Sequence, residues 1–436
     1  MAAVTAHSRR ASTANKKTLQ PTGRTARQPS SSLSHSRIHI QYSQPVSANH
    51  VKRKQPKRKI AVVTSSRADY AHLHWLLHDL ANHSAIELHV ISLGPHLSPE
   101  FGHTGRQIEK AGARTLTTVE CLLSSDTDIG MAKTLGTAAL GLADLLGRLR
   151  PDLLVLVADR YEMLAPACVA LTLRIPIAHI EGGEITAGAI DDAVRNAITK
   201  MAHLHFACTR RAEQRIISMG EESWRVTFSG SLSLDDLRRG KLLNKAQLEK
   251  KLGFSLPQKP ILALYHPVTL MNNEAEEATE FFAALRSVPH PVIFIYPNAD
   301  AGSRRIIRLA EEFIQEHPSS RLLVNLDHMT YLSLLKNSRV LVGNSSGGVI
   351  ESTSLGIPTL NIGLRQQGRE RAANVINVPA HRKKIAAALK RALSPQFAKT
   401  CRGLESPYGD GRASQRITKV LAATELGSKL LFKRAR

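Results

Sequence analysis

The first 59 residues contain no aspartate or glutamate, although they hold 13 of the chain's 59 lysines and arginines. With few apolar residues and charge of one sign, residues 1–58 are expected to form a disordered basic leader. The leader lacks the apolar stretch of a secretory signal, whereas its Arg- and Ser-rich composition is typical of an organelle transit peptide. A nuclear signal, an anion-binding tail or a mis-assigned start codon are the alternatives. For the rest of the chain we expect a cytoplasmic location.

Cysteines are few and far apart, at positions 121, 168, 208 and 401. No CxxC pair is present, which excludes the usual zinc spacings and argues against a disulfide framework in a chain of 436 residues. A reducing compartment is therefore favoured. Cys168 and Cys208 lie in apolar surroundings and are expected to be small core residues.

Long apolar runs are also missing. None reaches the roughly 18 residues that a membrane-spanning helix needs, so we expect no membrane partner. The net charge of +23 could suit a nucleic-acid partner, but more than half of it lies in the basic leader. That leader has a single aromatic residue, Tyr42, and so offers no platform for base stacking. We therefore expect no nucleic-acid partner.

From Ile60 onward, short apolar runs alternate with longer mixed segments, which predicts βαβ units on parallel sheets. The expected strands cover 60–64, 88–94, 151–157, 177–180, 205–208, 225–228, 261–265, 291–296, 321–324, 339–342 and 359–362. The expected helices cover 68–80, 131–149, 161–173, 190–202, 211–219, 275–287, 304–315, 330–336, 347–354 and 383–393.

This pattern predicts an α/β protein with two Rossmann-like domains and a ligand site in the cleft between them, at the carboxyl ends of the strands. The expected division is an N-terminal domain with the catalytic carboxylates, a linker, a C-terminal nucleotide-binding domain, and a C-terminal helix that packs back on the N-terminal domain. These parts cover 59–232, 233–258, 259–405 and 406–436.

The segment Gly343-Asn344-Ser345-Ser346-Gly347-Gly348 lies between an expected strand and an expected helix. Small residues let a ligand approach the backbone, and a helix N-terminus offers free N–H groups to phosphate. Glu351, further along that helix, could accept hydrogen bonds from ribose. The alternative is an ordinary N-cap and tight turn. Arg365 begins a basic loop after the next strand, which suits an anion but could also be a solvated loop.

Three carboxylates follow strands in the N-terminal half or open a helix there: Asp159, Glu181 and Asp191. If they converge, each raises the pKa of the others, which provides a proton donor beside an acceptor. A single such aspartate more often caps a helix. His266 follows the first strand of the second domain and would face the cleft, although a lone histidine is more often structural. HExxH and GxSxG are absent, so neither a zinc peptidase nor an α/β-hydrolase is supported.

From about Lys59 to Leu421, the chain resembles the hydrolysing UDP-N-acetylglucosamine 2-epimerases in its motifs and in their order. It is most similar to the sialic-acid branch, which includes the bacterial sialic-acid epimerase and the epimerase half of the animal bifunctional epimerase/kinase. The matching strings are SRADY (66–70), DR (159–160), HIEGGE (179–184), IDDAVRNAITKMAHLH (190–205), HPVT (266–269), PNADAGS (297–303), GNSSGGVIE (343–351), RQQGRE (365–370) and YGDG (408–411).

The resemblance implies a GT-B-type fold, no metal or redox cofactor, a nucleotide-sugar substrate, and a homodimer or homotetramer. It implies that UDP is eliminated from UDP-N-acetylglucosamine and that water then adds, giving N-acetylmannosamine for sialic-acid synthesis. The chemical residues that it implies are Asp159, Glu181, Asp191 and His266. The nucleotide or substrate contacts that it implies are Arg67, Arg160, Asn298, Ser345, Ser346, Glu351 and Arg365.

The chain departs from the family pattern at several positions. Ala158 replaces the usual glycine before the Asp-Arg pair, and Asn196 replaces a usual histidine. Arg308 and Glu311 stand where the animal enzymes carry two feedback-related arginines, so feedback by CMP-sialic acid is not expected. Alternatives are the same reaction on UDP-diacetylbacillosamine or GDP-N-acetylglucosamine, a non-hydrolysing 2-epimerase, and a GT-B glycosyltransferase.

Overall fold

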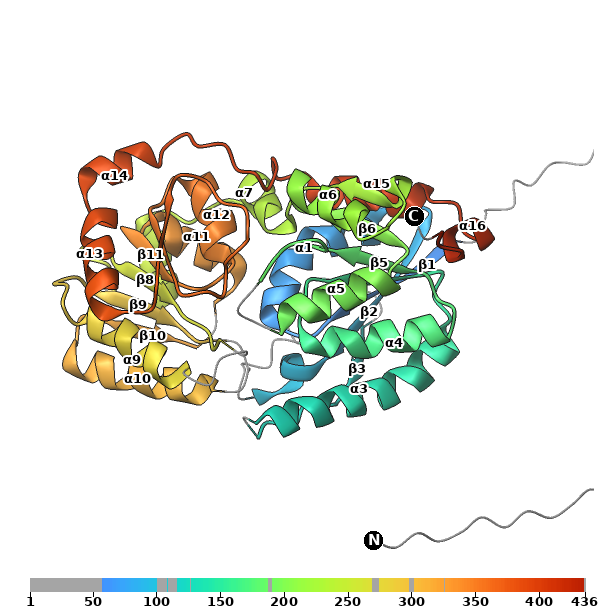
Figure 1. The fold of residues 1–436 in the computed structure, drawn as a ribbon, viewed down its shortest axis with the longest axis horizontal. Helices are drawn as coiled ribbons and strands as arrows, with labels where there is room; N and C mark the ends of the chain where they lie inside the picture. Colours follow the sequence, from blue (N-terminus) through green and yellow to red (C-terminus); the bar gives the residue numbers. More distant parts are fainter. Residues whose placement is uncertain are drawn as a thin grey trace, which may run out of the picture. The chain divides into compact units, whose positions relative to one another are not determined.

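Two parallel sheets, one in each half of the chain, organise the fold (Figure 1). The computed structural model describes residues 57–99, 108, 116–125, 127–186, 190–268, 274–297, 302–324 and 326–434, except for the side chains of residues 67, 68, 274 and 275. Residues 55–436 belong to one compact unit. We call the first sheet with its helices the N-lobe and the second sheet with its helices the C-lobe.

The N-lobe sheet has seven strands in the order β3-β2-β1-β4-β5-β6-β7, and all neighbours are parallel. Its strands are β1 (Arg58–Thr64), β2 (Ile86–Leu93), β3 (Leu116–Val119), β4 (Leu153–Val157), β5 (Ile177–Ile180), β6 (Leu204–Ala207) and β7 (Val226–Phe228). Its helices are α1 (Arg67–Asn82), α3 (Asp128–Leu149), α4 (Leu164–Thr172), α5 (Asp191–Met201) and α6 (Arg210–Ser218).

The C-lobe sheet has six parallel strands in the order β10-β9-β8-β11-β12-β13. Its strands are β8 (Ile261–Leu264), β9 (Val292–Ile295), β10 (Arg321–Leu323), β11 (Val340–Gly343), β12 (Thr359–Ile362) and β13 (Val375–Val378). The helices from residue 235 onward are α7 (Asp235–Arg239), α8 (Lys245–Leu252), α9 (Glu274–Leu285), α10 (Ser303–Glu316), α11 (His328–Lys336), α12 (Gly347–Leu355), α13 (Arg382–Ala392), α14 (Pro395–Thr400), α15 (Ala413–Ala423) and α16 (Ser428–Leu431).

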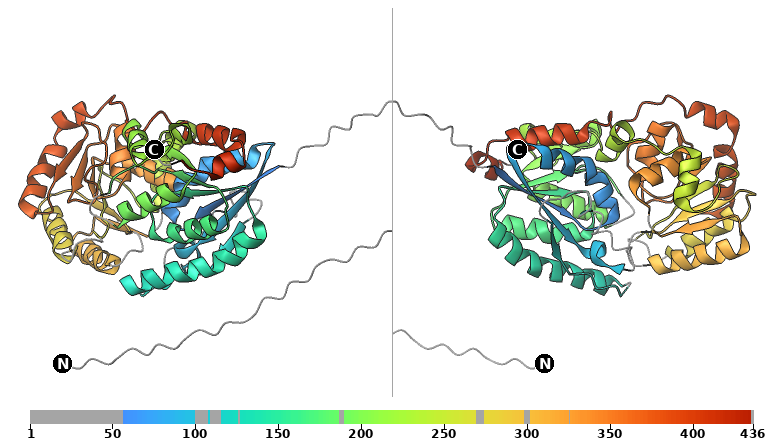
Figure 2. Two further views of the ribbon diagram at one scale, coloured as in Figure 1. Left: turned by 45° about the vertical axis from the view of Figure 1, so that its right-hand side comes forward. Right: turned by 180° about the vertical axis from the view of Figure 1, so that it is seen from behind.

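Strand β4 shows why the sequences of the central strands are continuous apolar runs. All five of its side chains are buried, and they alternate between the two faces of the sheet. Leu153 and Val155 pack with α1 and α15 on one face, while Leu154 and Leu156 pack with α3, α4 and α5 on the other. Figure 2 shows these helix layers on either side of the sheet. A parallel strand covered on both faces needs apolar residues at every position.

The end of the chain returns to the N-lobe. Helix α15 packs on α1, and its Ile417 and Leu421 join the core cluster that contains β1 and β4 (Figure 2). The buried Arg225 guanidinium donates to the carbonyl oxygens of Lys429, Leu430 and Phe432 at 2.7–3.0 Å. The C-terminal segment therefore covers one face of a sheet that begins about 360 residues earlier in the sequence.

Several features differ from the sequence-based expectations. The edge strands β3 and β13 were not expected, and the segment 233–258, expected as a linker, contains α7 and α8. Cys168 is exposed on α4, so the prediction that it is a core residue is wrong, whereas Cys208 is buried. Helix α3 is long and apolar enough to span a membrane by length and composition alone. One face of α3 is buried against the N-lobe.

Candidate active site

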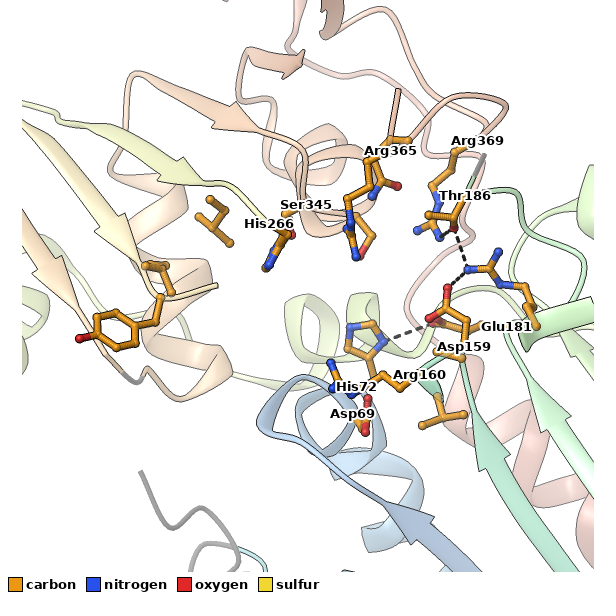
Figure 3. A pocket seen from close by; sticks show the side chains of 18 residues that line it. Asp69, His72, Asp159, Arg160, Glu181, Thr186, His266, Ser345, Arg365 and Arg369 are labelled. Carbon is orange, nitrogen blue, oxygen red and sulfur yellow. Dashed lines mark hydrogen bonds and ion pairs between the residues drawn. The ribbon is translucent and has the colours of Figure 1, made fainter. Parts of the chain in front are cut away.

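A cleft with about 920 Å³ of space lies between the lobes, at the carboxyl ends of the strands (Figure 3). The N-lobe contributes Asp69, His72, Val157, Ala158, Asp159, Arg160, Glu181, Thr186 and Arg195 to its lining. The C-lobe contributes Leu264, His266, Ile295, Tyr296, Ser345, Ser346, Arg365, Gln366 and Arg369. Both lobes therefore present charged groups to one shared space.

Helix α1 enters the cleft with a fixed first turn. Ser66 is its N-cap, and Asp69 closes a capping box by accepting from the backbone N–H groups of Ser65 and Ser66 at 3.0 and 3.1 Å. Asp69 is thus occupied in holding the helix terminus. One turn further on, the rigid helix carries His72 to the cleft, where its Nδ1 lies 3.3 Å from Glu181 Oε1.

Asp159 lies just after β4, separated from it by the strained residue Ala158. Ala158 has φ = 59°, a left-handed conformation that costs a residue with a Cβ about 1–2 kcal/mol, which explains why glycine is usual there. The His179 ring holds this turn, because its Nε2 lies 2.9 Å from the Ala158 carbonyl oxygen. Burial lowers the pKa of His179 to about 4, so this histidine is neutral and has a structural role near neutral pH.

The Asp159 carboxylate forms an ion pair with the buried Arg195 guanidinium. Arg195 in turn donates to the Glu184 carbonyl oxygen at 3.0 Å and to the Thr186 hydroxyl at 2.9 Å. Arg195 comes from α5, so the helix that follows β5 fixes the carboxylate that follows β4. This pairing places a guanidinium directly beside the Asp159 carboxylate.

Glu181 also adopts a left-handed conformation, with φ = 68°, immediately after β5. Burial opposes ionisation of this carboxyl, but His72, Arg369 and the Ser231 hydroxyl outweigh burial and lower its pKa. The sequence-based expectation that clustered carboxylates raise each other's pKa is therefore wrong for Glu181. The physical reason is that each carboxylate lies in contact with a basic side chain rather than with another acid.

On the C-lobe side, Asn344 positions His266. Its side chain accepts from the His266 backbone N–H at 2.7 Å and donates to the His266 carbonyl at 2.9 Å. The preceding Gly343 cannot be replaced, since a Cβ there would lie 1.7 Å from the Leu264 carbonyl oxygen. Close approach of β11 to β8 therefore requires the first glycine of the GNSSGG segment.

The two serines that follow lie at the start of α12. Ser346 occupies the N-cap position in a helical conformation, and its hydroxyl makes no capping bond within the described residues. The alternative that these serines serve as an ordinary cap is therefore not supported. Both line the cleft next to Arg365, which donates to Asn344 O at 3.3 Å and to Asp191 at 3.2 Å. Hydroxyls, a helix N-terminus and a guanidinium together form a site suited to a phosphate group.

A second pocket adjoins the cleft, with about 600 Å³ of space. It shares His72, Leu264, Ile295, Ser345 and Ser346 with the cleft and adds Ala71, Leu326, His328, Tyr331, Gly347 and Glu351. A ligand made of a sugar, a diphosphate and a nucleoside joined in a row would need such a continuous space.

Glu351 is buried in this adjoining pocket and lies 3.0 Å from His328 Nε2. The other nitrogen of His328 bonds to Asp236 of α7. Burial opposes the charge on His328, but these two carboxylates raise its pKa to about 10, so the ring is a permanent cation near neutral pH. His328 therefore joins the C-lobe pocket to the segment that connects the lobes.

Comparison with known proteins agrees with this geometry. Residues 78–422 match the family described as UDP-N-acetylglucosamine 2-epimerase. The chain belongs to this family.

Two relatives are named hydrolysing diacetylbacillosamine 2-epimerases. The GDP/UDP-N,N'-diacetylbacillosamine 2-epimerase of Campylobacter jejuni is 39% identical over 74% of this chain and 84% of its own length. The UDP-N,N'-diacetylbacillosamine 2-epimerase of Legionella pneumophila is 33% identical over 86% and 98%. The UDP-GlcNAc 2-epimerase of Neisseria meningitidis has a similar fold, with a TM-score of 0.72 and 18% identity over 84% of this chain and 100% of that structure. The predicted family and its GT-B-type fold are thus confirmed.

Most of the site residues that were selected from the sequence lie in the cleft or beside it. The cleft lining includes Asp159, Arg160, Glu181, His266, Ser345, Ser346 and Arg365, and the adjoining pocket includes Glu351. Asp191 is not among the described lining residues; it lies behind Arg365 as its ion-pair partner. The Arg67 side chain and Asn298 lie outside the described residues.

Sequence reasoning did not select several polar residues that the structure places in the cleft, among them His72, Thr186, Arg195 and Arg369. Arg195 and Arg369 lie inside motifs that carried the resemblance, so their motifs pointed to them. His72 had a weaker signal, as one of three histidines on the helix that follows SRADY.

Proposed function

We propose that this protein is a hydrolysing 2-epimerase that converts a UDP-linked 2-acetamido sugar and water to the free, C2-inverted sugar and UDP. One observation carries this proposal. Two carboxylates that each pair with a basic side chain, Asp159 and Glu181, lie across one cleft from Ser345, Ser346 and Arg365, a group suited to a phosphate.

The reaction needs both halves of the cleft. A carboxylate takes the C2 proton, the C1–O bond breaks, and its electron pair leaves with UDP, which gives a C1=C2 double bond. Water then adds its oxygen to C1, and an acid delivers a proton to the opposite face of C2. Because a C2–H is weakly acidic, stabilising the departing diphosphate is as necessary as the base.

The geometry suggests a division of roles. Asp159 and Glu181 line the cleft and would exchange protons with C2 and with water. Asp191, expected from the family to share in proton transfer, would instead hold Arg365 against the diphosphate. His266, whose backbone is held by Asn344, would assist the leaving phosphate.

For the sugar, we favour a UDP-linked 2,4-diacetamido-2,4,6-trideoxy hexose such as UDP-diacetylbacillosamine. The names of the Campylobacter and Legionella relatives, at 39% and 33% identity, support this choice. UDP-N-acetylglucosamine, the substrate that the motifs alone favoured, is the second candidate, and the description of the matching family supports it.

Product identification from a panel of nucleotide sugars tests both levels of the proposal. Purified protein would be incubated, without any acceptor, with UDP-diacetylbacillosamine, UDP-N-acetylglucosamine and their GDP counterparts, and the products would be separated and identified. Free C2-inverted sugar plus UDP supports the reaction, and the highest kcat/KM identifies the substrate. A UDP-linked epimer would instead indicate a non-hydrolysing enzyme, and turnover only with an acceptor would indicate a glycosyltransferase.

A further inference from the structure

We propose that His72 is a further catalytic residue, whose imidazolium contacts the substrate's diphosphate from the N-lobe while its Nδ1 holds Glu181 in place. This inference rests on the proposed function, because it assumes that a diphosphate lies between the cleft and the adjoining pocket. It concerns a residue that no family motif in this sequence includes.

The position of His72 is the first argument. It lines both the cleft and the adjoining pocket, as do Ser345 and Ser346 at the start of α12. A ligand that fills both spaces would pass between His72 on the N-lobe and the two serines on the C-lobe. Figure 3 shows His72 and Ser345 on the two sides of the cleft. In a nucleotide sugar the diphosphate is the group between sugar and nucleoside, so it would lie at this junction.

The hydrogen bonding of the ring is the second argument. Nδ1 faces Glu181 Oε1 at 3.3 Å, and within the described residues Nε2 has no hydrogen-bond partner from the protein. When the ring is protonated, both nitrogens are donors. One N–H would then hold the Glu181 carboxylate, and the other would be available to a phosphate oxygen.

Charges around the ring favour that protonated form. Burial opposes it, but Glu181 and Glu351 outweigh burial and the repulsion from His328, so that the pKa of His72 is raised. The permanent cation His328 does not replace His72, because its two nitrogens are engaged by Asp236 and Glu351.

Other charged groups share the cleft. Asp69 and Arg160 flank the N-lobe side, while His266 and Arg365 face it from the C-lobe. A bound diphosphate would add negative charge and stabilise the imidazolium further. The contribution of His72 should therefore be complete at low pH and disappear as the pH rises through its raised pKa.

The test compares wild type with His72→Gln, His72→Lys and the control His78→Gln, which changes an exposed histidine on the same helix. For each protein, the Kd of UDP by calorimetry and kcat by UDP release would be measured from pH 6 to pH 9. The ionisation of UDP itself is common to all four proteins, so differences between their profiles isolate the histidine.

We expect His72→Gln to lower kcat by about 10²-fold, as for loss of one charge-stabilising donor, and to weaken UDP binding roughly tenfold at pH 6. In the wild type and in His78→Gln, UDP binding should weaken toward pH 9. In His72→Lys it should not, because lysine remains charged over this range.

The inference is overturned if His72→Gln keeps kcat and UDP affinity within twofold of wild type, or if all four pH profiles of UDP binding coincide. Failure of the proposed function looks different. In that case no nucleotide sugar is turned over by the wild type, while the pH profile of UDP binding still separates His72→Lys from wild type.

Discussion

The two lobes present opposite chemistry to the same cleft. On the N-lobe, carboxylates point at the ligand space, and each is held by a base from another element: Asp159 by Arg195 and Glu181 by His72. On the C-lobe, serine hydroxyls, a helix N-terminus and Arg365 point at the ligand space. On the proposed function, proton transfer is a task of the N-lobe and most of the anion binding a task of the C-lobe, with His72 as the N-lobe's contribution to the anion site. We therefore expect that one task can be changed with the other largely intact.

The largest expected effect comes from Asp159→Asn. This change removes a proton acceptor but keeps the shape and a hydrogen-bond partner for Arg195, so we expect kcat to fall by about 10²–10⁴-fold. The Kd of UDP depends on the C-lobe groups and on His72 rather than on Asp159, so it should stay within about threefold. Steady-state kinetics and calorimetry on the same preparation measure both. An equal loss of UDP binding would contradict the separation of roles.

The N-lobe also holds a buried carboxylate, Glu221, that is not among the described cleft-lining residues. Burial opposes ionisation of Glu221, but hydrogen bonds from His205, Lys200 and Lys433 outweigh it and lower its pKa to about 2. Glu221→Gln removes the negative charge that those partners contact. The free energy of unfolding should therefore fall by about 3 kcal/mol near neutral pH.

The pH dependence of this effect has a definite sign. Because the folded-state pKa is depressed, the stabilisation by Glu221 is complete above its ordinary pKa and is lost as the pH falls toward 2. Thermal unfolding of wild type and Glu221→Gln from pH 7 to pH 3 should therefore show a gap in Tm that narrows on acidification. A constant gap would mean that packing, not charge, explains the difference.

A smaller effect is expected from Arg365→Gln on the C-lobe. Loss of this guanidinium should raise the Kd of UDP by about 10- to 100-fold, as for a charged hydrogen bond of 1.5–3 kcal/mol. Arg371→Gln is the matched control, since this arginine of the same loop is exposed and bonds to Asn377. If both changes weaken UDP equally, general positive charge rather than a placed contact binds the nucleotide.

The smallest effect is expected at Ala158, where the N-lobe tolerates strain to turn Asp159 into the cleft. Ala158→Gly relieves the left-handed conformation and should stabilise the protein by about 1 kcal/mol, measured by urea unfolding. Ala178→Gly in the buried, extended strand β5 should instead destabilise it. Destabilisation by both would show that Ala158 contributes more by packing than it costs in strain.

Alternation of apolar runs was sufficient to predict the two sheets, because central parallel strands such as β4 are buried on both faces. The edge strands β3 and β13 were missed since their side chains are partly exposed and carry no such run. Helices α7 and α8 were missed because both are short and lie in a polar segment.

The site shows the same limit. Glycine, serine and acidic residues at strand ends could be selected from the sequence, because a strand's carboxyl end is a known place for a ligand. The pairing of Arg195 with Asp159 and of His72 with Glu181 could not be predicted, since each contact joins elements far apart in the sequence. Their positions also change the expected acid–base behaviour, because His72 and Arg369 lower the pKa of Glu181 although burial raises it.

The most direct test of the central claim is an NMR measurement of the reaction in D₂O with a nucleotide sugar that the protein turns over. Elimination at Asp159 and Glu181 followed by addition of solvent predicts free sugar with inverted C2, one deuterium at C2, and an equivalent amount of UDP. A product that is still linked to UDP, or one that retains its original hydrogen at C2, would contradict the account.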